Sequence, residues 1–209
     1  MLKGEEVSAI ILAAGYSSRA LDFKPLLPLG GMTLLERAVR LFQKAGIEDL
    51  RVVLGYRAAD LLLLLKEWNI PAVINEEYAT GMFSSVTAGV ASLEPDRKAF
   101  FLLPVDIPLV RPQTLLELMQ AYPEGREDCI IHPVFHSRRG HPPLIAFRYA
   151  KEITEWKRSG GLSSFLRKFD SIAVYVEVSD EYIHWDLDTP EEYPKFVKRL
   201  SETGDPLSQ

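Results

Sequence analysis

The chain has 209 residues, and its 24 Lys and Arg against 29 Asp and Glu give a formal charge of −5 at pH 7. This length suits one domain with a real hydrophobic core, and a content of 47% hydrophobic and 25% charged residues excludes disordered and collagen-like classes. The acidic balance argues against nucleic acid as a partner, because phosphate backbones are bound by concentrated Lys and Arg. The single cysteine, Cys129, excludes an internal disulfide and zinc sites built on several cysteines.

Apolar runs are too short to cross a membrane. The N-terminal run covers residues 7–12 and a leucine run covers residues 61–65, whereas a membrane helix needs about 20 apolar residues. We interpret Leu61 to Leu65 as the buried face of a helix. The lone thiol suits a reducing compartment, so we expect a cytoplasmic enzyme or binding protein.

In the first 121 residues, short β-branched runs alternate with amphipathic segments. Thr33 is placed to cap one helix, Gly46 to end it, and Pro112 to open another. The predicted strands are 7–12, 50–54, 72–74 and 100–105, and the predicted helices are 34–45, 58–68, from Ser84 or Ser85 to 93, and 112–121.

Strands and helices that alternate predict an α/β fold, a Rossmann-like three-layer sandwich with a mostly parallel sheet. Ligands of such sheets bind at the carboxyl ends of the strands. The pattern loosens after residue 122, where we expect strands at 129–133, 144–147 and 172–178 and helices at 163–169 and 191–200. The polar tail, residues 201–209, is expected to fray. No linker divides residues 1–209, which predicts a single domain.

A loop of small residues follows the first predicted strand, from Ala13 to Arg19, and continues to Lys24. Small residues let backbone N–H groups approach an anion, and the two cations suit a polyphosphate. The spacing matches neither a Walker loop nor a dinucleotide fingerprint, so the residues themselves indicate an anion-binding loop. A tight turn with a solvated Arg and Lys is the alternative.

Asp106 ends the most hydrophobic predicted strand and lies between Pro104 and Pro108. A stiff carboxylate at the ligand edge suits a magnesium ligand, and a turn or helix-capping aspartate is the alternative. A second acidic segment, 186–192, is typical of a helix start, with Thr189 as the cap. Asp186 and Asp188 precede that start and would point to one side of an extended segment.

Other catalytic chemistries find little support. The four histidines, His132, His136, His141 and His184, have no zinc-site spacing. Ser17 and Ser18 do not lie in a nucleophile elbow, and Cys129 lies in an apolar run typical of a core residue.

The segments 12–19 (LAAGYSSR) and 24–29 (KPLLPL) resemble the nucleotide-binding signature of the MobA-like nucleotidyltransferases, in particular the molybdenum cofactor cytidylyltransferases. Four further segments match this family in order. They are 75–89, 105–108 (VDIP), 140–143 (GHPP) and 186–192 (DLDTPEE), so the resemblance extends from residue 7 to about 197.

The resemblance implies a Mg²⁺-dependent transfer of CMP from CTP to the phosphate of molybdopterin, with release of pyrophosphate. It implies a nucleotide-binding half of about residues 1–110 and an acceptor-binding half of about 111–200. Arg19, Lys24 and Asp106 would be catalytic, and Asp106 and Asp188 would hold the metal. The implied nucleotide-binding residues are Leu12, Ala13, Ala14, Gly15, Ser17, Ser18, Arg19, Lys24, Asn75, Gly81 and Ser85, and the implied acceptor-binding residues are His141 and Pro142.

One segment departs from the family pattern. Residues 19–24 are RALDFK, where the family usually has Arg-Met-Gly-x-x-Lys. Leu21 removes the backbone freedom of a glycine, and Asp22 adds negative charge near the phosphates. Ala13-Ala14-Gly15 resembles the cytidylyl branch and favours CTP over GTP.

Two alternatives stay open. The acceptor could be a sugar phosphate or alcohol phosphate, or the chain could be a non-catalytic nucleotide sensor or cofactor-insertion chaperone. A molybdoenzyme or its maturation factor is the protein partner that the resemblance suggests.

Overall fold

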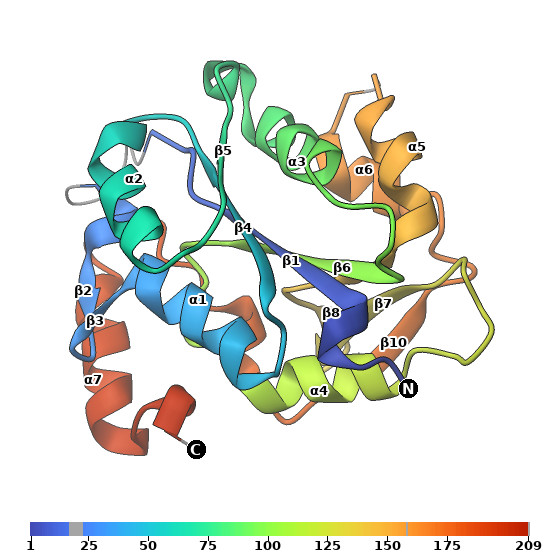
Figure 1. Ribbon diagram of the computed structural model, residues 1–209. Coiled ribbons are helices and arrows are strands. Elements are labelled where there is room, and N and C mark those ends of the chain that lie inside the picture. Colours follow the sequence, from blue (N-terminus) through green and yellow to red (C-terminus); the bar gives the residue numbers. More distant parts are fainter. Residues whose placement is uncertain (17–22, 158, 209) are drawn as a thin grey trace.

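The computed structural model describes residues 1–16, 23–157 and 159–208, and a mixed sheet runs through its centre (Figure 1). Across this sheet the strands lie in the order β10, β7, β9, β6, β1, β4, β5, with β8 paired to β7, while β2 and β3 form a small separate hairpin. The strands are β1 (Val7–Leu12), β2 (Pro28–Leu29), β3 (Met32–Thr33), β4 (Asp49–Leu54), β5 (Ala72–Ile74), β6 (Ala99–Pro104), β7 (Ile130–Phe135), β8 (Arg138–Arg139), β9 (Leu144–Ala146) and β10 (Val174–Glu177).

Most strand pairs are parallel. β1 pairs in parallel with β4 and β6, β4 with β5, and β10 with β7, whereas β9 runs antiparallel to β6 and β7. Leu12 is opposite Pro104 in the register, so β1 and β6 end side by side. Every residue of β1 is buried, as expected of a parallel strand covered on both faces. The predicted α/β fold with a mostly parallel sheet is confirmed.

Helices cover both faces of the sheet (Figure 1). α1 packs against α4 on one face, and α3 packs against α5 and α6 on the other. A Cβ on Gly89 of α3 would lie 2.6 Å from Ile10 Cγ2 and 2.9 Å from Val53 Cγ2, so only glycine lets α3 lie this close to β1 and β4. The helices are α1 (Leu34–Lys44), α2 (Ala58–Glu67), α3 (Met82–Ala91), α4 (Pro112–Gln120), α5 (Ala150–Thr154), α6 (Gly161–Arg167) and α7 (Tyr193–Thr203).

The predicted starts of α1 and α4 are confirmed, whereas the predicted start of α3 is wrong. Thr33 Oγ1 accepts a hydrogen bond from the Glu36 N–H at 3.1 Å, and Pro112 occupies the first turn of α4. α3 begins at Met82 rather than at Ser84 or Ser85. Gly81, immediately before it, has φ = +121°, which is not a helical backbone conformation, so the helix starts at the next residue.

The start of α7 also differs from the prediction. The helix begins at Tyr193, so Thr189 does not cap it. Instead, Glu192 Oε2 accepts hydrogen bonds from the N–H groups of Asp188 and Thr189, both at 2.8 Å. Residues 188–192 therefore form a turn held by Glu192, and Pro194 occupies the first turn of the helix.

The prediction that the C-terminal tail frays is wrong. Arg37 of α1 is fully buried, and Asp205 accepts two hydrogen bonds from its guanidinium, at 2.9 and 2.6 Å. Arg37 also donates to the carbonyl oxygens of Leu29 and Pro108, both at 3.2 Å, and Leu207 is buried. A buried cation needs a counter-ion, and the tail supplies it.

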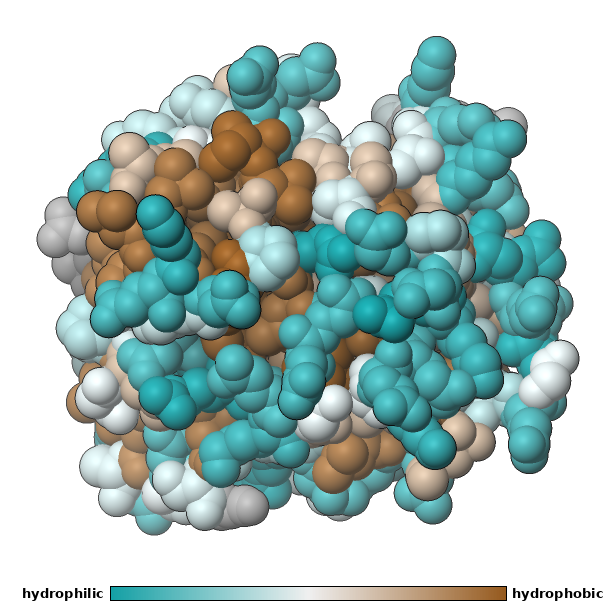
Figure 2. All heavy atoms as spheres, viewed as in Figure 1, coloured by the Kyte–Doolittle hydropathy of each residue, from teal (hydrophilic) through white to brown (hydrophobic). Residues whose placement is uncertain are grey.

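The leucine run lies on α2 but is only partly buried. Leu61 and Leu65 are buried, whereas Leu62 is 41% and Leu63 76% exposed, because a helix turns neighbouring side chains to different faces. Figure 2 shows hydrophobic side chains gathered over this region of the surface. None of the described helices combines the length and apolar character that crossing a membrane requires.

Candidate active site

A cleft of about 570 Å³ opens at the carboxyl ends of the central strands. The loop after β1 forms one wall, and its backbone is held by β4: the Ala13 N–H donates to the Val53 carbonyl at 2.9 Å, and Ala14 accepts from the Tyr56 N–H at 3.1 Å. The cleft brings together most of the predicted nucleotide-binding residues. They are Leu12, Ala13, Ala14, Gly15, Lys24, Gly81 and Ser85, and Asp106 joins them.

Lys24 lies between two carboxylates that are distant in the sequence. Its Nζ is 3.1 Å from Asp106 Oδ2 and 3.2 Å from Asp188 Oδ1. The Leu187 N–H donates to the Asp106 carbonyl at 2.8 Å, so the backbone fixes the acidic segment beside the end of β6. The structure thus brings the two predicted metal ligands and the predicted catalytic lysine to one point.

A third acid strengthens the negative field at this point. Burial raises the pKa of Asp186, and the charges of Asp188 and Asp106 raise it further. In the described part of the chain, no group of three or more His, Cys, Asp or Glu side chains could hold a metal ion by itself. Asp106 and Asp188 nevertheless fit Mg²⁺, which is commonly bound by one or two carboxylates together with substrate phosphates.

Asn75 lies behind the wall of the cleft. It is buried, and its Nδ2 donates to Ser84 Oγ at 2.8 Å and to Ser85 Oγ at 3.0 Å, while its Oδ1 accepts from the Glu77 N–H at 3.0 Å. The hydrogen bonds of its amide group therefore go to other residues of the protein, and they join loop 75–81 to α3. Ser85 itself reaches the cleft.

Aromatic side chains that the sequence did not single out lie around the same cleft. Tyr16 and Tyr78 both line it, their ring centroids are 5.1 Å apart, and Tyr56 is 5.2 Å from Tyr16. Such rings offer flat faces on which a nucleobase can stack. These tyrosines follow three different strands, which the sheet topology brings side by side. Their proximity could therefore not be seen in the sequence.

A second cleft, of about 420 Å³, shares Leu12, Met82 and Pro104 with the first. Its walls are mainly apolar, and α3 and α6 supply much of them. Of the predicted acceptor-binding residues, His141 lines this cleft, whereas Pro142 is buried and does not line it. The remaining lining residues are Phe83, Val86, Leu102, His132, Arg139, Gly140, Pro143, Gly160, Gly161, Leu162, Ser163 and Leu166.

Three predicted residues, Ser17, Ser18 and Arg19, lie outside the described residues, as does the unusual segment 20–22. Their place relative to the clefts is therefore still a prediction.

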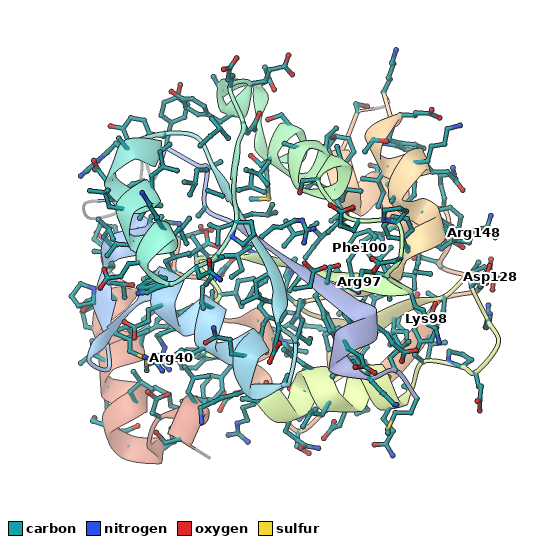
Figure 3. The ribbon with its side chains drawn as sticks, viewed as in Figure 1. Arg40, Arg97, Lys98, Phe100, Asp128 and Arg148 are labelled. Atoms are coloured by element: carbon teal, nitrogen blue, oxygen red, sulfur yellow. The ribbon has the colours of Figure 1, made fainter. Side chains whose placement is uncertain are left out.

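Two cations near the amino ends of the central strands, Arg97 and Lys98, have acidic partners. Figure 3 labels both residues, with Arg148 beyond them. Arg97 Nε is 3.1 Å from Asp49 Oδ2, and Lys98 Nζ is 2.6 Å from Glu6 Oε1. Because these pairs already neutralise Arg97 and Lys98, the carboxyl edge is the better place for an anionic substrate.

Comparison with known proteins decides the family. The sequence model of the MobA-like NTP transferase domain matches residues 9–173, which include every residue that lines the first cleft, Asp106 among them. The chain belongs to this family. It is thus a nucleotidyltransferase-family protein, and the resemblance found in its motifs is confirmed.

Two curated relatives extend along most of this MobA-like chain. Nicotine blue oxidoreductase from Paenarthrobacter nicotinovorans is 30% identical over 193 residues, which cover 89% of this chain and 94% of the relative. Molybdenum cofactor cytidylyltransferase from Escherichia coli K12 is 26% identical over 197 residues, covering 94% of this chain and 98% of the relative. The names of these two relatives thus describe two different activities.

The same fold occurs in solved structures. Rv0371c from Mycobacterium tuberculosis H37Rv superposes with a TM-score of 0.77 at 22% identity, covering 92% of this chain and 98% of that one. A structure of Rv0371c in complex with manganese has a TM-score of 0.74 at 23% identity. The MobA-like chain therefore shares its architecture with a protein that binds a divalent cation.

Proposed function

We propose that this MobA-like protein transfers CMP from CTP to the phosphate of a small acceptor, molybdopterin, and releases pyrophosphate. The observation that carries the proposal is the position of Lys24 between Asp106 and Asp188, at the end of the first cleft. The relative named molybdenum cofactor cytidylyltransferase, similar over 94% of the chain, supports this choice of nucleotide and acceptor.

In this proposal the first cleft holds the nucleotide. The small residues Ala13 to Gly15 let the backbone approach the triphosphate, and Lys24 supplies positive charge to it. Arg19 is proposed to add a second cation. Gly81 and Ser85 lie at the start of α3, where the helix dipole favours negative charge, and the tyrosines around the cleft offer faces for the cytosine ring.

Asp106 and Asp188 would hold Mg²⁺ in this proposal. The ion would neutralise charge that develops on the leaving pyrophosphate. Both carboxylates contact Lys24 in the structure, and in this proposal its ammonium turns toward a phosphate oxygen when the nucleotide binds.

The acceptor would occupy the second cleft. Because the two clefts share Leu12, Met82 and Pro104, a phosphate at their boundary lies next to the α-phosphorus of the nucleotide. An acceptor phosphate is already anionic, so positioning matters more than removal of a proton by a base. The acceptor-binding half, residues 111–200, would then work together with Met82 and Phe83 of α3.

The decisive experiment follows pyrophosphate release. The full chain is incubated with MgCl₂, each of the four nucleoside triphosphates, and molybdopterin, a sugar phosphate or glycerol 3-phosphate. Pyrophosphate with CTP and molybdopterin supports the proposal, and pyrophosphate with another pair identifies a different transferase of the same chemistry. Nucleotide binding without turnover on any acceptor contradicts the proposal and favours the nucleotide sensor.

The relative named nicotine blue oxidoreductase adds a control of another reaction class. The same mixtures, supplied with NADH or NADPH in place of the triphosphate and with a redox dye as electron acceptor, are followed at the absorbance of the reduced nicotinamide. We expect no oxidation that depends on the protein.

A further inference from the structure

His132 is a buried histidine that the nucleotide chemistry does not use. It lies on β7, is only 4% exposed and lines the second cleft. Its ring stacks against the ring of Tyr175, with centroids 5.8 Å apart and an interplanar angle of 18°. Among the described residues its Nε2 has no hydrogen-bond partner. Buried polar atoms of this kind call for an explanation, and an absent ligand is one.

The ring of His132 is neutral at physiological pH. Burial lowers the pKa of His132 to about 4, and the positive charge of Arg139 acts in the same direction. Asp170, which opposes this effect, is paired with Arg139 at 2.7 Å. A neutral imidazole donates through one nitrogen and accepts through the other, so it can match an uncharged hydrogen-bonding group.

A second imidazole in the same wall has the same property. His141 lines the cleft, and its buried Nδ1 has no hydrogen-bond partner in the described part of the chain. Burial also lowers the pKa of His141. Two neutral rings thus offer hydrogen bonds in a cleft whose other walls include Phe83, Leu162 and Leu166.

This combination selects for one class of acceptor. The walls are mainly apolar, and beside the two imidazoles their polar side chains are Ser163 and Arg139, whose charge is paired with Asp170. Such a cleft suits a flat, uncharged ring that carries N–H and C=O groups at its edge. A polyol would leave hydroxyl groups against Phe83 and Leu162 without partners, which disfavours its binding.

We propose that His132 is a specificity-determining residue, which hydrogen-bonds the edge of a flat, uncharged heterocycle in the acceptor and so selects it over sugar and alcohol phosphates. The inference rests on the proposed function in taking the second cleft as the acceptor site. Nε2 itself is covered by its neighbours, so the proposal requires the ring to turn about its Cβ–Cγ bond when it meets the ligand.

The test uses pterin, the bare 2-amino-4-oxopteridine ring system, as the probe. Its fluorescence is titrated with the full chain in the presence of CTP and MgCl₂. His132→Phe keeps a flat ring against Tyr175 but removes both nitrogens, and His136→Asn is the matched control because His136 is exposed and does not line the cleft. Loss of one neutral hydrogen bond weakens binding by roughly tenfold. We therefore expect a tenfold higher Kd for His132→Phe, no change for His136→Asn, and partial recovery for His132→Gln.

An unchanged Kd in a folded His132→Phe protein would overturn the inference, as would equal binding of pterin and glycerol 3-phosphate to the wild type. If His132→Phe does not fold, the test is made on the wild-type protein labelled with ¹⁵N-histidine, whose ring-nitrogen resonances are followed by NMR. Addition of pterin must then shift the ring-nitrogen resonances of His132, and unshifted resonances contradict the proposal.

Pyrophosphate release separates this inference from the proposed function. If pterin binding depends on His132 but no nucleotide is transferred, the cleft is assigned correctly and the transferase proposal fails. If nucleotide is transferred and the acceptor KM and kcat are unchanged in His132→Phe, the transferase proposal stands and the role of His132 is refuted. A rise in the acceptor KM with unchanged KM for CTP supports both.

Discussion

Replacement of Asp205 by Asn tests whether the C-terminal tail is part of the folded core. The change removes the negative charge that faces Arg37 but keeps the shape of the side chain. Arg37 is fully buried, and two of its four hydrogen bonds go to Asp205. The variant therefore leaves a buried cation without its counter-ion.

The size of the effect follows from this burial. Removal of one partner from a buried ion pair costs about 3–5 kcal/mol, and the 20% exposure of the Asp205 side chain places the loss near the lower end, about 3 kcal/mol. In a domain of this size each kcal/mol corresponds to about 2–4 °C. We expect the Tm to fall by about 6–12 °C.

Thermal and urea unfolding followed by circular dichroism measure the loss. Glu202→Gln is the matched control, because Glu202 also lies near the C-terminus and its pair with Lys198 is exposed, at 3.7 Å; such pairs contribute about 0–1 kcal/mol. A Tm for Asp205→Asn within about 2 °C of the control would refute the reasoning.

The same pair predicts a pH dependence. Burial acts to raise the pKa of Asp205, but the hydrogen bonds from Arg37 and from the Leu207 N–H outweigh it, so the pKa is lowered in the folded protein. A lowered pKa stabilises the fold above the unfolded value, about 3.9 for Asp, and that stability is lost as the pH falls through the folded value. The difference between wild type and Asp205→Asn should therefore be full at pH 7 and should shrink below about pH 4.

Three further predictions concern the first cleft. Asp106→Asn should lower kcat at least about 100-fold, because it removes the charge of one of the two carboxylates proposed to hold Mg²⁺, while the Tm stays close to that of wild type; near wild-type turnover would disprove the metal assignment. Gly81→Ala should destabilise the fold by about 2 kcal/mol, since φ = +121° is unfavourable for alanine although open space surrounds the site, and an unchanged denaturation midpoint would contradict this. GTP should compete poorly with CTP for binding in a displacement assay, and equal competition by the two nucleotides would remove the basis for cytidine specificity.

Much of the fold could be predicted from local patterns. β1 is apolar at every position except Ser8 because both its faces are covered, and such a run identifies a central parallel strand without tertiary information. Thr33 marks a helix start through its side-chain hydroxyl, and Pro112 does so through its missing N–H. Asp106 could be placed at the ligand edge because it directly follows a strand whose direction the βαβ alternation fixes.

Other features depend on contacts between distant segments. The tail is polar in composition, and nothing local shows that Asp205 meets a buried Arg37 across the fold. His132 carried no motif, and its importance comes from the cleft that α3 and α6 build around it. The prediction of a helix cap at Thr189 was wrong because residues 188–192 form a turn held by Glu192, and α7 begins only at Tyr193.

The arrangement of Lys24 between two aspartates has a consequence for the order of ligand binding. Asp106, Asp188 and Lys24 together carry one excess negative charge, and Asp186 adds to the negative field beside them. A triphosphate that arrives alone would meet this repulsion. If Asp106 and Asp188 hold Mg²⁺, as proposed, the cation would neutralise the carboxylates and leave Lys24 to contact the phosphates. We therefore expect positive thermodynamic linkage, in which each ligand raises the affinity for the other by the same factor.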